Sequence, residues 1–218
     1  MDTIPNRSVP LVSERKSELR KHFLPSSGVF RVLKMRNLLV LGVILLVSWW
    51  LAMYSPLFHK APPPGVRLTD LHSVDQFQGL FDANAGMPRL VLIYSPTCAV
   101  CIRSANWLQT EVLNKYPKAK LRAYAIWTNK LVFDSRGQWD AGGLTDRRVV
   151  HLWDPKDVMG NWFFYQLSGY QGPTWDTYLL FGKNGTWSNL PSSLMGSGGT
   201  VEDEEGTITQ SLSPLLKG

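Results

Sequence analysis

The sequence predicts an α/β domain in which strands and helices alternate, preceded by one N-terminal transmembrane helix. Three observations predict this. Residues 38–58 contain no charged side chain, residues 90–94 form a continuous apolar run followed by helical spacing, and two strand-like segments near residue 184 flank a turn. The length of 218 residues fits one domain of ordinary size with tails.

The uncharged run over residues 38–58 predicts the membrane helix. Its 21 residues would span about 30 Å as a helix, which matches a bilayer core. Trp49, Trp50 and Tyr54 lie toward its C-terminal end, where amphipathic rings prefer the interface. Lys and Arg precede it, and these residues stay cytoplasmic. We therefore expect a single-pass protein with its N-terminus in the cytoplasm and its domain extracytoplasmic, which is periplasmic in a bacterium.

Two alternatives for this run were weighed. A cleaved signal peptide has a short basic region and an apolar stretch of about 7–15 residues, whereas 36 residues precede this longer run. A buried core helix is disfavoured by the basic residues directly before the run and the Pro cluster after it. The run therefore favours a signal-anchor. The expected parts are a cytosolic basic tail (1–36), a transmembrane anchor (37–58), a Pro-rich linker (59–65), a folded domain (66–190) and a disordered C-terminal tail (191–218).

The charge of the chain is concentrated before the membrane run. Up to residue 36 there are eight Lys/Arg and three Asp/Glu, which leaves fifteen and fourteen of the totals of 23 and 17 for the rest. The folded part is therefore close to neutral. A nucleic-acid partner is not expected, because nucleic-acid binding needs basic residues clustered on a folded face.

The first half of the domain alternates strand and helix. Residues 66–68 predict a short strand, and residues 73–84 predict a helix capped by Ser73. The apolar run over 90–94 predicts a central strand buried on both faces. Residues 98–115 place apolar side chains on one helical face, and residues 121–127 predict a second central strand.

The second half of the domain is less regular. Residues 128–150 predict an insertion, followed by a strand over 147–153 and a helix over 156–167. Asn184-Gly185 is a strong turn signal, so residues 177–181 and 186–187 predict a hairpin. Residues 191–218 are rich in Ser, Gly and Thr and carry an acidic run, so a disordered tail is expected there.

The two cysteines lie three positions apart, where the buried strand turns into a helix. At a helix N-terminus, unpaired amides and the macrodipole favour a thiolate, so a lowered pKa is expected to make Cys98 a nucleophile. Cys101, one turn later, is expected to attack the resulting mixed disulfide. The spacing brings the two sulfurs close enough to form a bond.

At this motif the chain resembles the thioredoxin superfamily, over residues 66–187. The strand VLIYSPTCAVC, the following helix and the segment TYLLFGKNGTW carry the resemblance. The resemblance implies a three-layer α/β/α thioredoxin-like fold, disulfide exchange with cysteine-bearing proteins, no cofactor and no metal. It also implies substrate binding around the segment opposite the cysteines, at Pro173, Trp175 and Asp176.

The chain departs from the family pattern at three places. Leu92 stands where thioredoxins carry a buried acid six residues before the nucleophile. The position of the family's cis-proline falls on Asp176, and the nearest proline is Pro173. Ala99-Val100 replaces the commoner Gly-Pro between the cysteines. The family's route for proton transfer is therefore missing, and the dipeptide that helps to set the redox potential differs from the commoner one.

Two hypotheses of different classes follow. The favoured one is a membrane-tethered thiol-disulfide oxidoreductase, whether reductase, oxidase or isomerase. The alternative is a binding module, either a redox-inactive scaffold or a copper or zinc carrier in which His151 joins Cys98 and Cys101. A stable local disulfide is the simplest structural alternative for the two cysteines.

Overall fold

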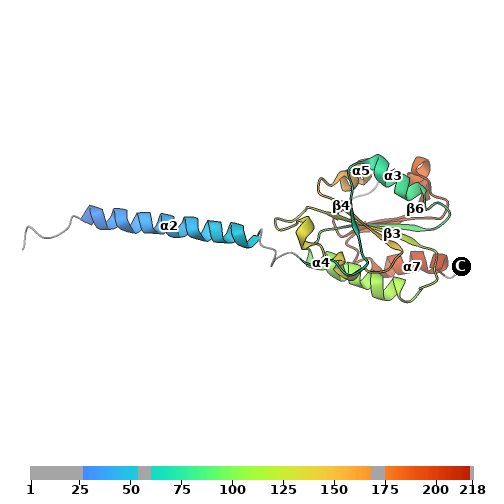
Figure 1. Ribbon diagram of the computed structural model, residues 1–218. Coiled ribbons are helices and arrows are strands. Elements are labelled where there is room, and N and C mark those ends of the chain that lie inside the picture. The colour runs from blue at the N-terminus through green and yellow to red at the C-terminus, as the bar shows by residue number, and fades with distance from the viewer. Residues whose placement is uncertain (1–26, 54–59, 168–174, 217–218) are drawn as a thin grey trace, which may run out of the picture. The chain divides into compact units, whose positions relative to one another are not determined.

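The computed structural model describes residues 27–53, 60–167 and 175–216 (Figure 1). The chain divides into two compact units, Met1–Ser55 and Pro56–Gly218. Each unit is described below by itself.

In the N-terminal unit, the residues that the structure describes form one helix, α2 (Ser27–Met53). This helix begins before residue 37, where the anchor was expected to start. From Met35 onward nearly all of its side chains are exposed, including Leu38, Ile44 and Leu46. Tyr54 and the rest of the uncharged run fall outside the described residues. Of the helices in the described segments, none is long and apolar enough to cross a membrane.

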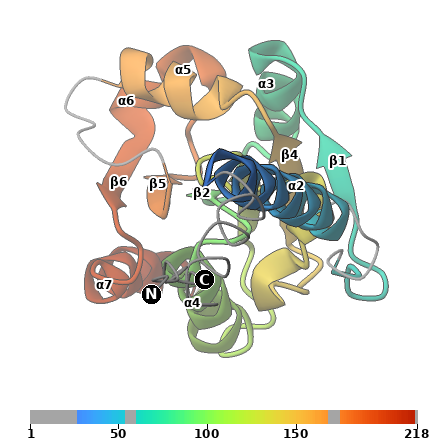
Figure 2. The ribbon, with the colours of Figure 1, turned by 90° about the vertical axis from the view of Figure 1, so that its left-hand side faces the viewer.

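One mixed sheet forms the centre of the second unit. In the described residues it has six strands in the order β1-β4-β3-β2-β5-β6. The first four run parallel, and β5 and β6 are antiparallel to their neighbours. Figure 2 shows the sheet from its end, with β1 and β6 at the two edges. The strands are β1 (Leu68–Asp70), β2 (Arg89–Tyr94), β3 (Arg122–Thr128), β4 (Val149–Asp154), β5 (Thr177–Phe181) and β6 (Leu194–Gly199).

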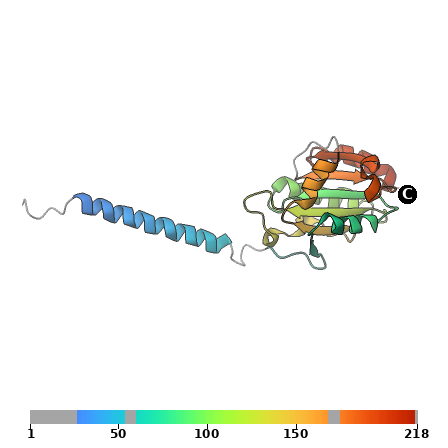
Figure 3. The same ribbon diagram turned by 90° about the horizontal axis from the view of Figure 1, so that it is seen from above.

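Helices cover both faces of the sheet, which gives three layers (Figures 1 and 3). On one face α3 (Val74–Asp82) and α5 (Val158–Gln166) pack through Phe77, Phe81 and Phe163. On the other face lie α4 (Ala99–Trp107), its π-helical continuation η2 (Leu108–Leu113), and α7 (Glu205–Leu216). These layers confirm the expected α/β/α arrangement.

Local sequence explains several of these elements. Ser73 is the N-cap of α3, as predicted, and its hydroxyl accepts from the Gln76 amide at 3.2 Å. The helix α5 begins beside the Asp154 carboxylate, which accepts from the amides of Val158 and Met159 at 2.9 and 2.8 Å. Every residue of β2 is buried, as expected for a strand with neighbours on both sides and helices on both faces.

The insertion between β3 and β4 contains two short 3₁₀ turns, η3 (Arg136–Gln138) and η4 (Ala141–Gly143). Gly142 and Gly143 have φ values of 56° and 84°. A Cβ on Gly142 would lie 2.9 Å from the Trp127 ring. Glycine is therefore required where this insertion packs against Trp127 and α4.

The C-terminal segment corrects two expectations. Residues 186–187 do not form the second strand of a hairpin, because Trp187–Asn189 is a 3₁₀ turn (η5) followed by the short helix α6 (Leu190–Ser193). On the edge of β5 away from β2, the pairing strand is β6, which lies in the segment expected to be a disordered tail. Most of that segment is ordered because α7 has its own apolar face, on which Ile208, Leu212 and Leu216 are buried.

Candidate active site

The strand β2 carries the chain directly to the cysteine motif. It lies between β3 and β5, and all six of its residues are buried. The motif therefore begins at the carboxyl end of a central strand, which is the usual place for a site in an open α/β sheet. The chain then passes Ser95, Pro96 and Thr97 and enters α4 at Cys98.

Cys98 is the N-cap residue of α4. Its Sγ accepts a hydrogen bond from the Cys101 amide at 3.3 Å. This is the contact that a helix N-terminus offers to an acceptor, and the macrodipole there favours negative charge. Cys98 is 8% exposed, whereas Cys101 is fully buried, and both are free thiols. Cys98 therefore keeps a small exposed fraction, and Cys101 keeps none.

Cys101 lies one turn further along and has a different environment. Its Sγ accepts from the Ser95 amide at 3.5 Å. Burial raises the pKa of the Cys101 thiol strongly, and the neighbouring Cys98 side chain raises it further, while the Ser95 amide lowers it only in part. Cys101 is therefore a protonated thiol at neutral pH, and it must lose that proton before it can act as a nucleophile.

Asp134 holds the segment before Cys98 in place, and the sequence analysis did not identify it. Its carboxylate accepts from the Ser95 hydroxyl at 2.7 and 2.9 Å and from the Thr97 hydroxyl and amide at 2.6 and 3.2 Å. It also accepts from the amides of Lys130 and Leu131, on its own loop. Burial alone would raise the pKa of Asp134, but these hydrogen bonds outweigh it and lower the pKa. The carboxylate therefore ties the insertion to the segment that leads into the cysteine motif.

The loop that Asp134 anchors presents apolar side chains to solvent. Leu131, Val132 and Phe133 are 40%, 92% and 47% exposed. Large apolar side chains gathered at one exposed loop often mark a binding surface. Because Asp134 bonds to the residue before Cys98, this apolar loop lies next to the cysteine motif.

The three predicted substrate-binding residues have different placements. Pro173 lies outside the described residues. Trp175 is 38% exposed and precedes β5, so substrate contact through its ring stays a prediction. Asp176 is 1% exposed, which leaves its side chain almost no surface to offer a substrate.

His151 is placed as a structural side chain of β4. Its Nδ1 accepts from the indole Nε1 of Trp127 at 3.1 Å. Burial lowers the pKa of His151 to about 4, with a partial offset from the backbone of Leu144, so the ring is neutral. Within residues 27–53, 60–167 and 175–216, no three His, Cys, Asp or Glu side chains are grouped to hold a metal ion.

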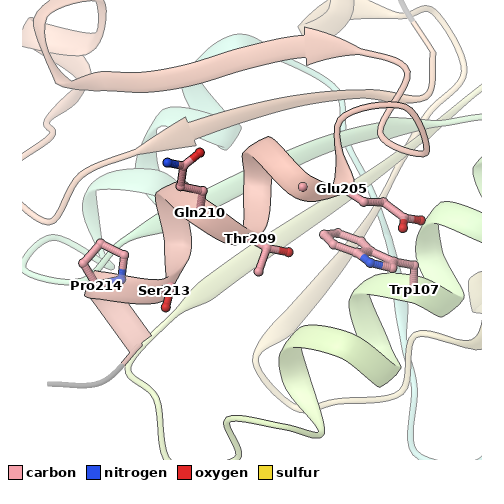
Figure 4. A pocket seen from close by; sticks show the side chains of 7 residues that line it. Trp107, Glu205, Thr209, Gln210, Ser213 and Pro214 are labelled. Atoms are coloured by element: carbon pink, nitrogen blue, oxygen red, sulfur yellow. The ribbon is translucent and has the colours of Figure 1, made fainter.

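A shallow groove lies apart from the cysteines, between α4 and α7 (Figure 4). Its volume is about 830 Å³. The residues labelled in the figure are Trp107, Glu205, Thr209, Gln210, Ser213 and Pro214. None of them is a thiol or a neighbour of one, so the groove is not part of the candidate active site.

Comparison with known proteins finds similarity to solved structures alone. No protein-family model matches the chain, and no curated protein matches it. A Chlorobium tepidum protein assigned as thiol:disulfide interchange protein DsbE is 15% identical, with a TM-score of 0.44, over 62% of this chain and 83% of that one. A thioredoxin-like protein solved in its oxidized form is 16% identical, with a TM-score of 0.42, over 72% and 95%.

A third similar structure is a secreted Mycobacterium tuberculosis disulfide oxidoreductase homologous to E. coli DsbE. It is 18% identical, with a TM-score of 0.35, over 59% of this chain and 84% of that one. We base the functional proposal on this chain's own residues and their geometry.

Proposed function

We propose that this protein is a thiol-disulfide oxidoreductase that exchanges disulfides with cysteine-bearing proteins through Cys98 and Cys101. One observation carries the proposal. The slightly exposed Cys98 caps the N-terminus of α4, its sulfur accepts from the Cys101 amide, and the fully buried Cys101 thiol lies one turn later. This pairs a nucleophile with a protected resolving thiol.

The proposed exchange takes place in two steps. The Cys98 thiolate attacks one sulfur of a substrate disulfide, a Cys98–substrate bond forms, and the other substrate sulfur leaves as a thiolate. Cys101 then loses its proton and attacks Cys98 Sγ, which releases the second substrate thiolate and leaves a Cys98–Cys101 disulfide. The substrate gains two electrons, and the domain loses them. The same steps in reverse oxidise a dithiol substrate.

Protein substrates are favoured over small thiols by the surface around Cys98. The exposed Leu131, Val132 and Phe133 lie on the loop that Asp134 ties to the cysteine motif. Apolar side chains of an unfolded or extended polypeptide would find contacts there. A small disulfide would reach Cys98 without using that loop.

We further propose that residues 38–58 anchor the domain to a membrane, with the N-terminus cytoplasmic and the domain outside. The 21 uncharged residues, the basic residues before them and the exposed apolar side chains of α2 support this. After an alkaline carbonate wash of cell membranes, the full chain is expected in the pellet. Its release into the supernatant would contradict the anchor.

The catalytic proposal is tested by replacing Cys98 with Ser in the full chain, purified in detergent. Insulin reduction with a dithiol as the electron source is expected to fall to the uncatalysed rate, because a hydroxyl at this position is a poor nucleophile at neutral pH. Asp75→Asn, an exposed substitution on α3, is the control and should keep the full rate. If Cys98→Ser turned insulin over as fast as the control, the mechanism would be wrong.

A further inference from the structure

The two-step exchange needs an acceptor for the Cys101 proton, and the strand before the motif does not supply one. Leu92, at the position of the family's buried acid, is apolar and fully buried. It pairs across the sheet with Tyr178 of β5. The resolving thiol has a raised pKa, so unassisted loss of its proton would be slow.

The sheet places a different carboxyl group beside the motif. In the antiparallel pairing of β2 with β5, Ile93 lies opposite Thr177. The next positions toward the cysteines are Tyr94 and Asp176. Tyr94 and Tyr178 point into the core on the α4 side, together with Cys101. Asp176 directly precedes β5, and its side chain lies near the Ser104 hydroxyl of α4, which places it on this same side of the sheet.

Asp176 is a buried carboxylate without a well-formed hydrogen bond. It is 1% exposed, and neither of its carboxylate oxygens makes a hydrogen bond of ordinary geometry within the described residues, although the Ser104 hydroxyl lies near enough to lower its pKa. The Tyr94 hydroxyl is likewise buried there without a partner. The backbone of Asp176 is held in place, because its carbonyl accepts from the Val201 amide at 2.9 Å. An unpaired buried carboxylate is costly, so its retention calls for a functional explanation.

Electrostatics couple this carboxyl group to the resolving thiol. Burial raises the pKa of Asp176, and the Ser104 hydroxyl and two nearby backbone amides offset this only in part. The Asp176 charge in turn contributes to the raised pKa values of Cys101 and Tyr94. A carboxylate whose charge opposes ionisation of a nearby thiol is suited to taking up the proton that the thiol loses.

We propose that Asp176 accepts the proton of Cys101 when Cys101 attacks the mixed disulfide on Cys98. This inference rests on the proposed exchange function. The S–H bond of Cys101 breaks, the proton goes to a carboxylate oxygen, and the sulfur electron pair forms the bond to Cys98 Sγ. The electron pair of the Cys98–substrate bond leaves with the substrate sulfur. The proton then passes from the carboxyl group to solvent, which restores the carboxylate for the next cycle.

The test uses Asp176→Asn in the full chain in detergent. The side chain keeps its size, and Asn tolerates the φ of 51° at this position. The raised pKa means that the carboxyl contributes stability only at low pH and loses it as the pH rises through the folded-state pKa. The variant is therefore expected to be at least as stable as the wild type toward urea at pH 7.

Rapid quench with acid separates the two chemical steps, with a disulfide-containing peptide as the substrate. Formation of the Cys98–peptide bond is expected to be unchanged within about twofold in Asp176→Asn, because Cys98 does not use the carboxylate. Release of the peptide thiol is expected to slow by at least about tenfold, within the range by which general bases contribute to catalysis. Asp75→Asn is the control and should leave both steps unchanged.

The pH profile provides a reading that a structural role would not produce. Release by Asp176→Asn is expected to rise about tenfold per pH unit, as solvent base takes over, whereas release by the wild type should be nearly independent of pH above the Asp176 pKa. The titratable or charged groups that act on Asp176 or are acted on by it are Tyr94 of β2, Cys101 and Arg103 of α4, and Glu202 after β6.

The possible failures are distinguishable. Removing the Asp176 charge alone should lower the pKa of Cys101, so a purely electrostatic role predicts equal or faster release, and that result would overturn the inference. Such a result from a folded variant would leave the proposed exchange function intact. If wild-type Cys98 formed no bond to the peptide, the proposed function itself would be wrong. A variant that failed to fold would contradict the stability expected here, and the wild-type pH profile would then decide.

Discussion

Replacement of Cys101 by Ser is expected to leave the protein covalently attached to its substrates. Cys98 keeps its position at the N-terminus of α4 and forms the mixed disulfide, but no second thiol follows to release it. We expect the half-life of the mixed disulfide to lengthen by at least about a hundredfold at neutral pH. An oriented intramolecular thiol attacks the mixed disulfide much faster than a dilute external thiol does.

The measurement is a non-reducing gel followed by mass spectrometry of the adduct. Cells that express Cys101→Ser should accumulate high-mass species that collapse on reduction, and the partner proteins would be identified from them. The double variant Cys98→Ser/Cys101→Ser is the matched control and should form none. Equal amounts of adduct from wild type and Cys101→Ser would contradict the assignment of Cys101 as the resolving thiol.

Replacement of Arg89 by Ala is expected to cause the largest loss of stability. Arg89 is fully buried at the start of β2, and its guanidinium donates to the carbonyls of Gly182 and Gly185 at 2.9 and 2.7 Å and to that of Phe81 at 3.3 Å. It also lies 4.2 Å from the centre of the Phe81 ring. Its removal leaves buried carbonyls unpaired and opens a cavity.

The expected cost is about 3 to 5 kcal/mol in the free energy of unfolding, a large share of the stability of an ordinary domain. Urea unfolding of the full chain, followed by tryptophan fluorescence, measures it. Arg67→Ala is the matched control, since Arg67 is exposed before β1, and should change stability little. A loss below about 1 kcal/mol would show that the carbonyls find other partners.

The elements that local sequence patterns specify were predicted well. The apolar run before the cysteines is a central buried strand, Ser73 caps α3, and Cys98 lies at a strand-to-helix junction. Each of these depends on residues within a few positions of one another. Short runs of consecutive side chains are enough to indicate a strand buried on both faces, a helix cap and the turn into α4.

The features that sequence reasoning missed depend on distant residues. The Asp134 contacts with Ser95 and Thr97 join positions 37 to 39 residues apart. Asp176 was placed opposite the cysteines by the resemblance, as a substrate-binding residue, and its burial beside Tyr94 follows from the pairing of β5 with β2. Composition gave no reason to expect a buried carboxylate at either position, because a carboxylate in a loop is ordinarily a solvated side chain.

The C-terminal segment was mispredicted for a different reason. Its Gly and Ser content is typical of a flexible tail, but β6 uses this content for close packing. A Cβ on Gly198 would lie 3.2 Å from the Tyr178 ring. Ile208, Leu212 and Leu216 recur at intervals of four residues in the sequence, and this spacing indicates one face of a helix. Composition over the whole segment concealed that short amphipathic pattern.

The late position of α7 affects the order in which the protein is completed. Cys98 and Cys101 leave the ribosome about a hundred residues before Ile208, Leu212 and Leu216 are synthesised. Those three side chains belong to the same core cluster as both thiols. During synthesis both cysteines are therefore present before the last residues of their core cluster have been added, so this core can be completed only at the end of translation.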